Sequence, residues 1–247
     1  MWANYLRTIL LFAFFLLSLW AIMEQKAFLS VLDGYERSGL IMQIRTMAHD
    51  LHKSVNQTYG GHLPYGYHLD MVATAVSSYG HLVCASEQDV LPMLFGAFFH
   101  DSIEDARVTY NDVLKVARGV MSNEQALMAT EIVYALTNDK GRNRAERAGE
   151  KYYAGIRSTP YAPFVKLCDR MANVVFSCSD SDEYNDRMKE IYKKEMPHFL
   201  KAISPLAADE EHAADARFSV PSELVEKMMG CLSDEPLSED ELKTAWP

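Results

Sequence analysis

The spacing of apolar residues constrains the fold of this chain more than any other feature of its sequence. Apolar side chains recur every three or four residues in four separate runs, at 69–79, 90–99, 124–136 and 164–176. Such a period places them along one face of an α-helix. The alternation typical of half-buried strands is scarce. The sequence therefore predicts an all-α protein.

Two helix starts can be placed from polar residues. Ser122 is followed three residues later by Gln125, and Ser86 is followed by Asp89. A serine with an acid or amide at this spacing is typical of a helix N-terminus, where side chains satisfy free backbone N–H groups. Both serines are therefore expected to cap helices.

Net charge and cysteine spacing limit the class of protein. The chain has 24 Lys+Arg against 34 Asp+Glu, a net charge of −10. Proteins that grip a nucleic-acid backbone rely on a basic surface, so no nucleic-acid polymer is expected as a partner. The four cysteines have no Cys-x-x-Cys spacing, which argues against a zinc knuckle or a disulfide framework and favours a reducing cytoplasm.

The most informative string follows the apolar run 90–99. His100 and Asp101 are adjacent. Glu104 follows His100 by four residues, and Asp105 follows Asp101 by four residues. Residues four apart share a helix side, so an imidazole and three carboxylates gather at one helix end. They could reach a cation beyond that end, or form an ordinary solvated acidic helix end.

Two other strings add candidate ligands. His68 follows Pro64 and Tyr65, where a turn meets a helix, while Asp169 and Asn173 lie one turn apart in an apolar run. A carboxylate in an apolar helix needs a partner. For Asp169 that partner is either a bound cation or a nearby base, Lys166 or Arg170.

Together these strings resemble the HD-domain metal-dependent phosphohydrolases, whose pattern is H…HD…D. The likeness is nearest to the RelA/SpoT-type hydrolase domains and the small alarmone hydrolases, and it covers residues 41–180. It rests on His-Asp-x-x-Glu-Asp at 100–105, on Ala-Leu-Thr-Asn-Asp-Lys at 135–140 followed by Glu146-Arg147, and on Val-Lys-Leu-Cys-Asp-Arg at 165–170 ending at Asn173.

The resemblance implies a domain organisation and a cofactor. An HD-type helical bundle is expected at 40–205. Composition alone adds an apolar N-terminal helix within 1–30 and a short acidic helical appendage at 206–247. One divalent metal ion, expected to be Mn²⁺, is implied, although the ligand types also suit Fe²⁺ or Zn²⁺. Its implied ligands are His68, His100, Asp101 and Asp169.

The resemblance also implies catalytic and substrate-binding roles. Glu104 and Asp105 are expected to orient and deprotonate the metal-bound water. Asn173 is expected to support the ligand shell or the ribose end of the substrate. Basic side chains match phosphate geometry, although those at 140–151 could instead belong to a solvated helix of mixed charge. The expected substrate-binding residues are Lys53, Tyr65, Lys140, Arg142, Arg144, Arg147 and Asn173.

The expected partner is a small phosphorylated nucleotide. The leading candidate is a (p)ppGpp-like alarmone, from which a metal-bound hydroxide removes the 3′-pyrophosphate. One stretch departs from the family, since Lys53 is the only basic residue in 53–59, where alarmone hydrolases carry an Arg/Lys group. An HD-type phosphomonoesterase or phosphodiesterase with another nucleotide is an alternative, as is a non-catalytic membrane-tethered nucleotide sensor.

An apolar stretch near the start of the chain bears on localisation. Residues 8–23 carry no charge and would span roughly 24 Å as a helix, just short of a ~30 Å hydrocarbon core. Residues 6–23 are therefore a candidate inner-membrane anchor for a cytoplasmic catalytic domain. A targeting segment, a buried helix and a later translation start are the alternatives.

Overall fold

The computed structural model describes residues 25–138, 149–179 and 183–233. It is 74% helical and 2% strand, which confirms the all-α prediction. Residues 25–37 are helical. The helices that follow are α2 (Leu40–Ser54), α3 (Gly66–Tyr79), α4 (Val90–Phe99), α5 (Tyr110–Arg118), α6 (Asn123–Leu136), α8 (Glu150–Arg157), α9 (Ala162–Ser179), α10 (Glu183–Ile203), α11 (Glu210–Ala214) and α12 (Ser222–Cys231).

Shorter elements connect several of these helices. Strands β1 (Thr58–Tyr59) and β2 (Leu63–Pro64) form an antiparallel hairpin between α2 and α3. Short 3₁₀ helices lie at η1 (Gly80–Leu82), η2 (Glu87–Asp89) and η3 (Ala216–Phe218). All four apolar runs lie on helices. Helix α4 begins and ends at the two end residues of the run 90–99.

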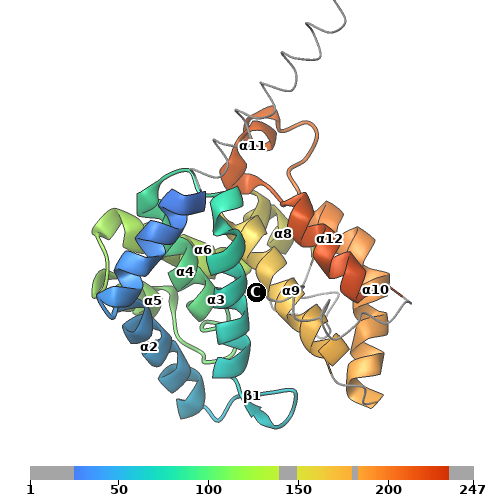
Figure 1. Ribbon diagram of the computed structural model, residues 1–247, viewed down its shortest axis with the longest axis horizontal. Helices are drawn as coiled ribbons and strands as arrows, with labels where there is room; N and C mark the ends of the chain where they lie inside the picture. Colours follow the sequence, from blue (N-terminus) through green and yellow to red (C-terminus); the bar gives the residue numbers. More distant parts are fainter. Residues whose placement is uncertain (1–24, 139–148, 180–182, 234–247) are drawn as a thin grey trace, which may run out of the picture.

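The core is built around α4, whose residues are all buried. Helices α3 and α6 pack against α4, and α9 packs against α3, α10 and α12. Figure 1 shows α3 and α9 side by side in the middle of the molecule. The elements that carry the predicted ligands are therefore packed on one another.

The capping predictions had different outcomes. Ser122 and Gln125 form a capping box at the start of α6, which confirms that prediction. Ser86 was expected to cap in the same way, but its side chain makes no capping hydrogen bond. The helix there is a single 3₁₀ turn, so it lacks the run of free N–H groups that an α-helix presents.

The described part of the predicted appendage is helical. Helix α12 packs against α9 and buries Leu224, Met228 and Cys231. Upstream, the Tyr161 N–H donates to the Arg217 carbonyl oxygen at 2.6 Å. In the part of the chain that the structure describes, no helix is long and apolar enough to cross a membrane. The candidate anchor at 6–23 and residues 234–247 lie outside the described residues.

A glycine on α4 provides a test of the packing against α6. A Cβ on Gly96 would lie 2.7 Å from Cγ2 of the buried Ile132. We expect Gly96→Ala to lower the free energy of unfolding by about 1–3 kcal/mol through overpacking. Gly155→Ala on α8 is the control, since a Cβ there meets no atom within 4 Å and alanine favours helix. Equal effects in denaturant titrations would contradict the close approach.

Candidate metal centre

The four predicted metal ligands come together where α3, the end of α4 and α9 meet. His68 lies in the first turn of α3, His100 is the C-cap of α4 with Asp101 directly after it, and Asp169 lies inside α9. His68, His100 and Asp169 are each at most 8% exposed. One ligand atom from each of these three lies within 4.8 Å of the others.

The ligand atoms face one centre. The Nε2 atoms of His68 and His100 are 3.3 Å apart. Asp169 Oδ1 lies 3.2 Å from the His68 Nε2, and Asp101 Oδ2 lies 2.9 Å from the His100 Nε2. His68, His100 and Asp169 therefore form a group that could hold a metal ion, and Asp101 lies beside it through its contact with His100.

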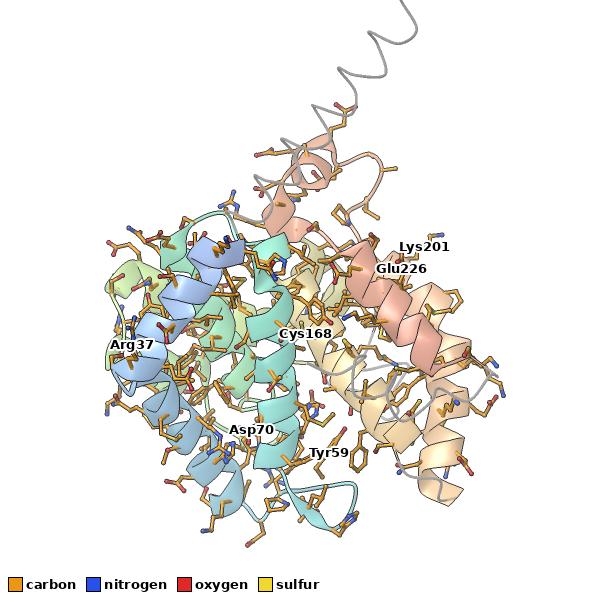
Figure 2. The ribbon with its side chains drawn as sticks, in the orientation of Figure 1. Arg37, Tyr59, Asp70, Cys168, Lys201 and Glu226 are labelled. Atoms are coloured by element: carbon orange, nitrogen blue, oxygen red, sulfur yellow. The ribbon has the colours of Figure 1, made fainter. Side chains whose placement is uncertain are left out.

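Helix packing places His68 at this centre. Asp70 accepts two hydrogen bonds from Arg45 of α2, at 2.7 and 2.6 Å, and lies 2.9 Å from the His49 Nε2. Figure 2 shows Asp70 on the side of α3 that faces α2, whereas Tyr59 lies on the side toward α9. A Cβ on Gly66 would fall 2.5 Å from the His49 ring. A glycine at this position allows α2 and the start of α3 to pack closely.

The tautomer of His100 suits metal binding. Its Nδ1 lies 2.8 Å from the Ala97 carbonyl oxygen, which can only accept a hydrogen bond. Nδ1 therefore carries a proton, and Nε2 is the nitrogen that faces the centre. The Nε2 atoms of both histidines can bind one cation when neither carries a proton. The donor set thus fits a divalent metal ion.

The carboxylates remain ionised at this centre. Burial acts to raise the pKa of Asp101, but His100 outweighs it and the pKa lies below its ordinary value. The pKa of Asp169 is likewise lowered, because Lys166 and His68 overcome the effect of burial. For His100, burial is overcome by Asp101 and Asp169, which raise its pKa to about 9. Negative charge at the centre therefore favours a cation.

A second pair of carboxylates lies beside the four ligands. Asn138 Nδ2 donates to Glu104 Oε2 at 2.7 Å, and Gln57 Nε2 donates to Asp105 Oδ2 at 2.8 Å. Burial, together with Asp101 and Glu104, raises the pKa of Asp105 to about 6. Asp105 is thus a carboxylate that can exchange a proton near neutral pH.

Two predicted substrate-binding residues contact the ligands directly. Asn173 Nδ2 donates to Asp169 Oδ1 at 2.7 Å, and the Asn173 Oδ1 accepts from the Tyr59 hydroxyl at 3.1 Å. The Tyr65 hydroxyl donates to Asp101 Oδ2. Asn173 and Tyr65 therefore orient the two carboxylate ligands.

The other predicted substrate-binding residues are not part of this cluster as described. Lys53 is exposed and does not line the pocket around the ligands. The remaining four, Lys140, Arg142, Arg144 and Arg147, lie outside the described residues.

Three of the four predicted ligands, His68, Asp101 and Asp169, line a pocket of about 230 Å³. Its described lining includes four acids, Asp101, Glu104, Asp105 and Asp169, and two bases, Lys166 and Arg170. A second pocket of about 600 Å³ shares Asn173 and Tyr192 with the first. Its lining includes Tyr59 and Phe176 and has no charged side chain among the described residues. An acidic pocket therefore adjoins an uncharged, partly aromatic one.

Sequence reasoning missed some members of the site. Asn138 has no signal apart from the string 135–140, and Gln57 lies 48 residues before Asp105, to which it donates. Tyr192 lies 19 residues beyond Asn173 on a helix of ordinary amphipathic pattern, so nothing local marks it.

No protein-family model matches the chain, and no curated protein matches it.

A buried histidine behind the ligands makes stability dependent on pH. The His52 ring stacks on Tyr65 with 4.6 Å between ring centroids, is fully buried, and has no hydrogen-bond partner at either nitrogen among the described residues. Burial lowers its pKa to about 4. Between the ordinary pKa of 6.5 and 4, the unfolded chain therefore binds a proton that the folded chain does not.

Stability should accordingly fall as the pH falls through this window. We expect wild type to lose about 2–3 kcal/mol more unfolding free energy than His52→Phe between pH 7 and 4.5. Phenylalanine keeps the stacking and cannot titrate. Denaturant titrations at the two pH values measure the difference, and parallel losses in both proteins would show that His52 titrates normally.

Proposed function

We propose that this chain is a metal-dependent phosphohydrolase of the HD type, with an HD-type bundle at 40–205, that hydrolyses a small phosphorylated nucleotide. One observation carries the proposal: two imidazoles and two carboxylates converge beside a second pair of carboxylates, Glu104 and Asp105. Metal binding alone requires only the first four groups. A second carboxylate pair in the same pocket suits proton transfer during hydrolysis.

Each group of site residues has its own role in the proposed hydrolysis. A divalent ion bound by His68, His100, Asp101 and Asp169 would supply Lewis acidity and lower the pKa of water. Asp105 accepts the proton of the attacking water, and its hydrogen bond from Gln57 holds the carboxylate in position. The water oxygen forms a bond to phosphorus as the bond from phosphorus to the leaving oxygen breaks. Glu104, held by Asn138, orients the water.

The adjoining pocket suits the nucleoside part of such a substrate. A volume of about 600 Å³ with Tyr59, Phe176 and Tyr192 in its lining favours a flat, uncharged group such as a nucleobase. The phosphates then extend into the acidic pocket across Asn173. The leading substrate remains a (p)ppGpp-like nucleotide that carries a 3′-pyrophosphate.

Product analysis tests this proposal. The full chain, loaded with Mn²⁺ or treated with EDTA, is incubated with nucleotides that carry a pyrophosphate, a monophosphate or a cyclic phosphate. Pyrophosphate release that requires metal is expected. Orthophosphate or a ring-opened product would instead indicate a phosphomonoesterase or a phosphodiesterase. If a protein that binds Mn²⁺ turns over none of them, the proposal is wrong and a nucleotide sensor becomes the better interpretation.

A further inference from the structure

We propose that Lys166 is a further substrate-binding residue, a fixed cation that contacts a phosphate oxygen beside the bound metal ion. The inference deepens the proposed function and rests on it for the identity of the substrate. It assigns to an ammonium the place that a second metal ion takes in two-metal phosphoryl-transfer sites.

The carboxylate of Asp169 carries the geometric argument. Its Oδ1 faces the candidate metal position, 3.2 Å from the His68 Nε2. Its Oδ2 accepts a hydrogen bond from the Lys166 Nζ at 2.8 Å. In two-metal sites the ions lie about 3.5–4 Å apart and clamp the reacting oxygens between them. Asp169 joins a metal position to an ammonium in the same way.

Lys166 is held at the edge of the pocket. It lies one helical turn before Asp169, and its side chain is 16% exposed. The Nζ also lies 5.8 Å from the ring centroid of Tyr152, whose hydroxyl donates to the Leu136 carbonyl oxygen at 3.2 Å. An ammonium has three N–H donors. With one donor on Asp169 and one toward the Tyr152 hydroxyl, it retains a third for a phosphate oxygen in the pocket that it lines.

The described lining of the pocket offers few cations to a phosphate. Lys166 and Arg170 are its only lysine and arginine, against four acids. The Arg170 Nη1 donates to Glu195 Oε2 at 2.9 Å, and its guanidinium packs on Phe199 with 4.4 Å to the ring centroid. The Arg170 guanidinium is thus held by two residues of α10. Lys166, which forms an ion pair with the candidate ligand Asp169 inside the pocket, is better placed to meet an anion.

Binding measurements on the full chain test the role without requiring turnover. Mn²⁺ affinity is measured by calorimetry, and the affinity of the Mn²⁺-loaded protein for inorganic pyrophosphate is measured next. The variants are Lys166→Gln, which keeps a donor for Asp169, Lys166→Met and Lys166→Arg. Lys227→Met is the matched control, since this half-buried lysine bonds to Tyr79, eleven residues beyond His68 on α3.

The two affinities should move in opposite directions. Loss of a positive charge beside Asp169 should tighten Mn²⁺ binding about tenfold, whereas loss of an ammonium contact should weaken pyrophosphate binding about tenfold or more. Lys166→Arg should lie near wild type in both, and Lys227→Met should change neither.

The opposite result would overturn the inference. If Lys166→Gln and Lys166→Met bind Mn²⁺ more weakly and pyrophosphate as well as wild type, Lys166 only supports Asp169. The same conclusion follows if Lys166→Met fails to fold and the folded Lys166→Gln binds pyrophosphate normally. Failure of the proposed function would give a different result. The wild-type protein would bind Mn²⁺ and pyrophosphate but would hydrolyse no nucleotide.

Discussion

Asp101→Asn is expected to lower kcat/KM by about 10³-fold or more, because it removes a metal ligand and a charge from the centre together. Asp101 Oδ2 lies 2.9 Å from the His100 Nε2 and accepts the Tyr65 hydrogen bond. An asparagine retains the size of the side chain. Its neutral amide binds a divalent ion far more weakly than a carboxylate does. Mn²⁺ calorimetry and initial rates with the preferred nucleotide measure the two losses.

The control for Asp101→Asn is Asp33→Asn. Asp33 is a carboxylate 59% exposed, in an ion pair with Arg37, and such pairs contribute little to stability. This variant should match wild type in Mn²⁺ binding and rate. Full activity of a folded Asp101→Asn protein would contradict the assignment of Asp101 as a ligand.

The sequence predicts those site residues that stand out from the residues next to them in the chain. His68 follows a turn, His100 and Asp101 end an apolar run, and Asp169 interrupts another, so each stands out within its own segment. The hydrogen bonds from Asn138 to Glu104 and from Gln57 to Asp105 join residues 34 and 48 positions apart. Amides are ordinary at helix ends and in loops, so such pairings follow only from how the helices pack.

Asp169 shows that two alternatives read from the sequence need not exclude each other. Its partner was expected to be either a cation site or a nearby base. The structure has the ion pair with Lys166 at 2.8 Å and also the group with His68 and His100. A carboxylate has two oxygens, each able to accept from a different partner. The pattern of an apolar helix shows that a partner is needed but not how many there are.

Asp105→Asn is expected to reduce turnover by about 10²–10⁴-fold while Mn²⁺ binding remains, because it removes a general base and no ligand. Asparagine can still accept the hydrogen bond from Gln57 that Asp105 accepts at 2.8 Å, so the loop should keep its conformation. In Mn²⁺ calorimetry the variant should therefore resemble wild type. A parallel loss of metal affinity and rate would instead place Asp105 among the ligands.

The role of Asp105 as a base also predicts how kcat/KM changes with pH. Burial, with Asp101 and Glu104, raises the pKa of Asp105 to about 6. A base acts only when ionised, so kcat/KM of wild type should fall about tenfold for each pH unit below about 6. Glu104→Gln should lower the rate and keep an acidic limb, since Asp105 remains, but move it to lower pH, because Glu104 no longer raises the pKa of Asp105. In Asp105→Asn the limb should be absent. Its persistence there would mean that another group accepts the proton.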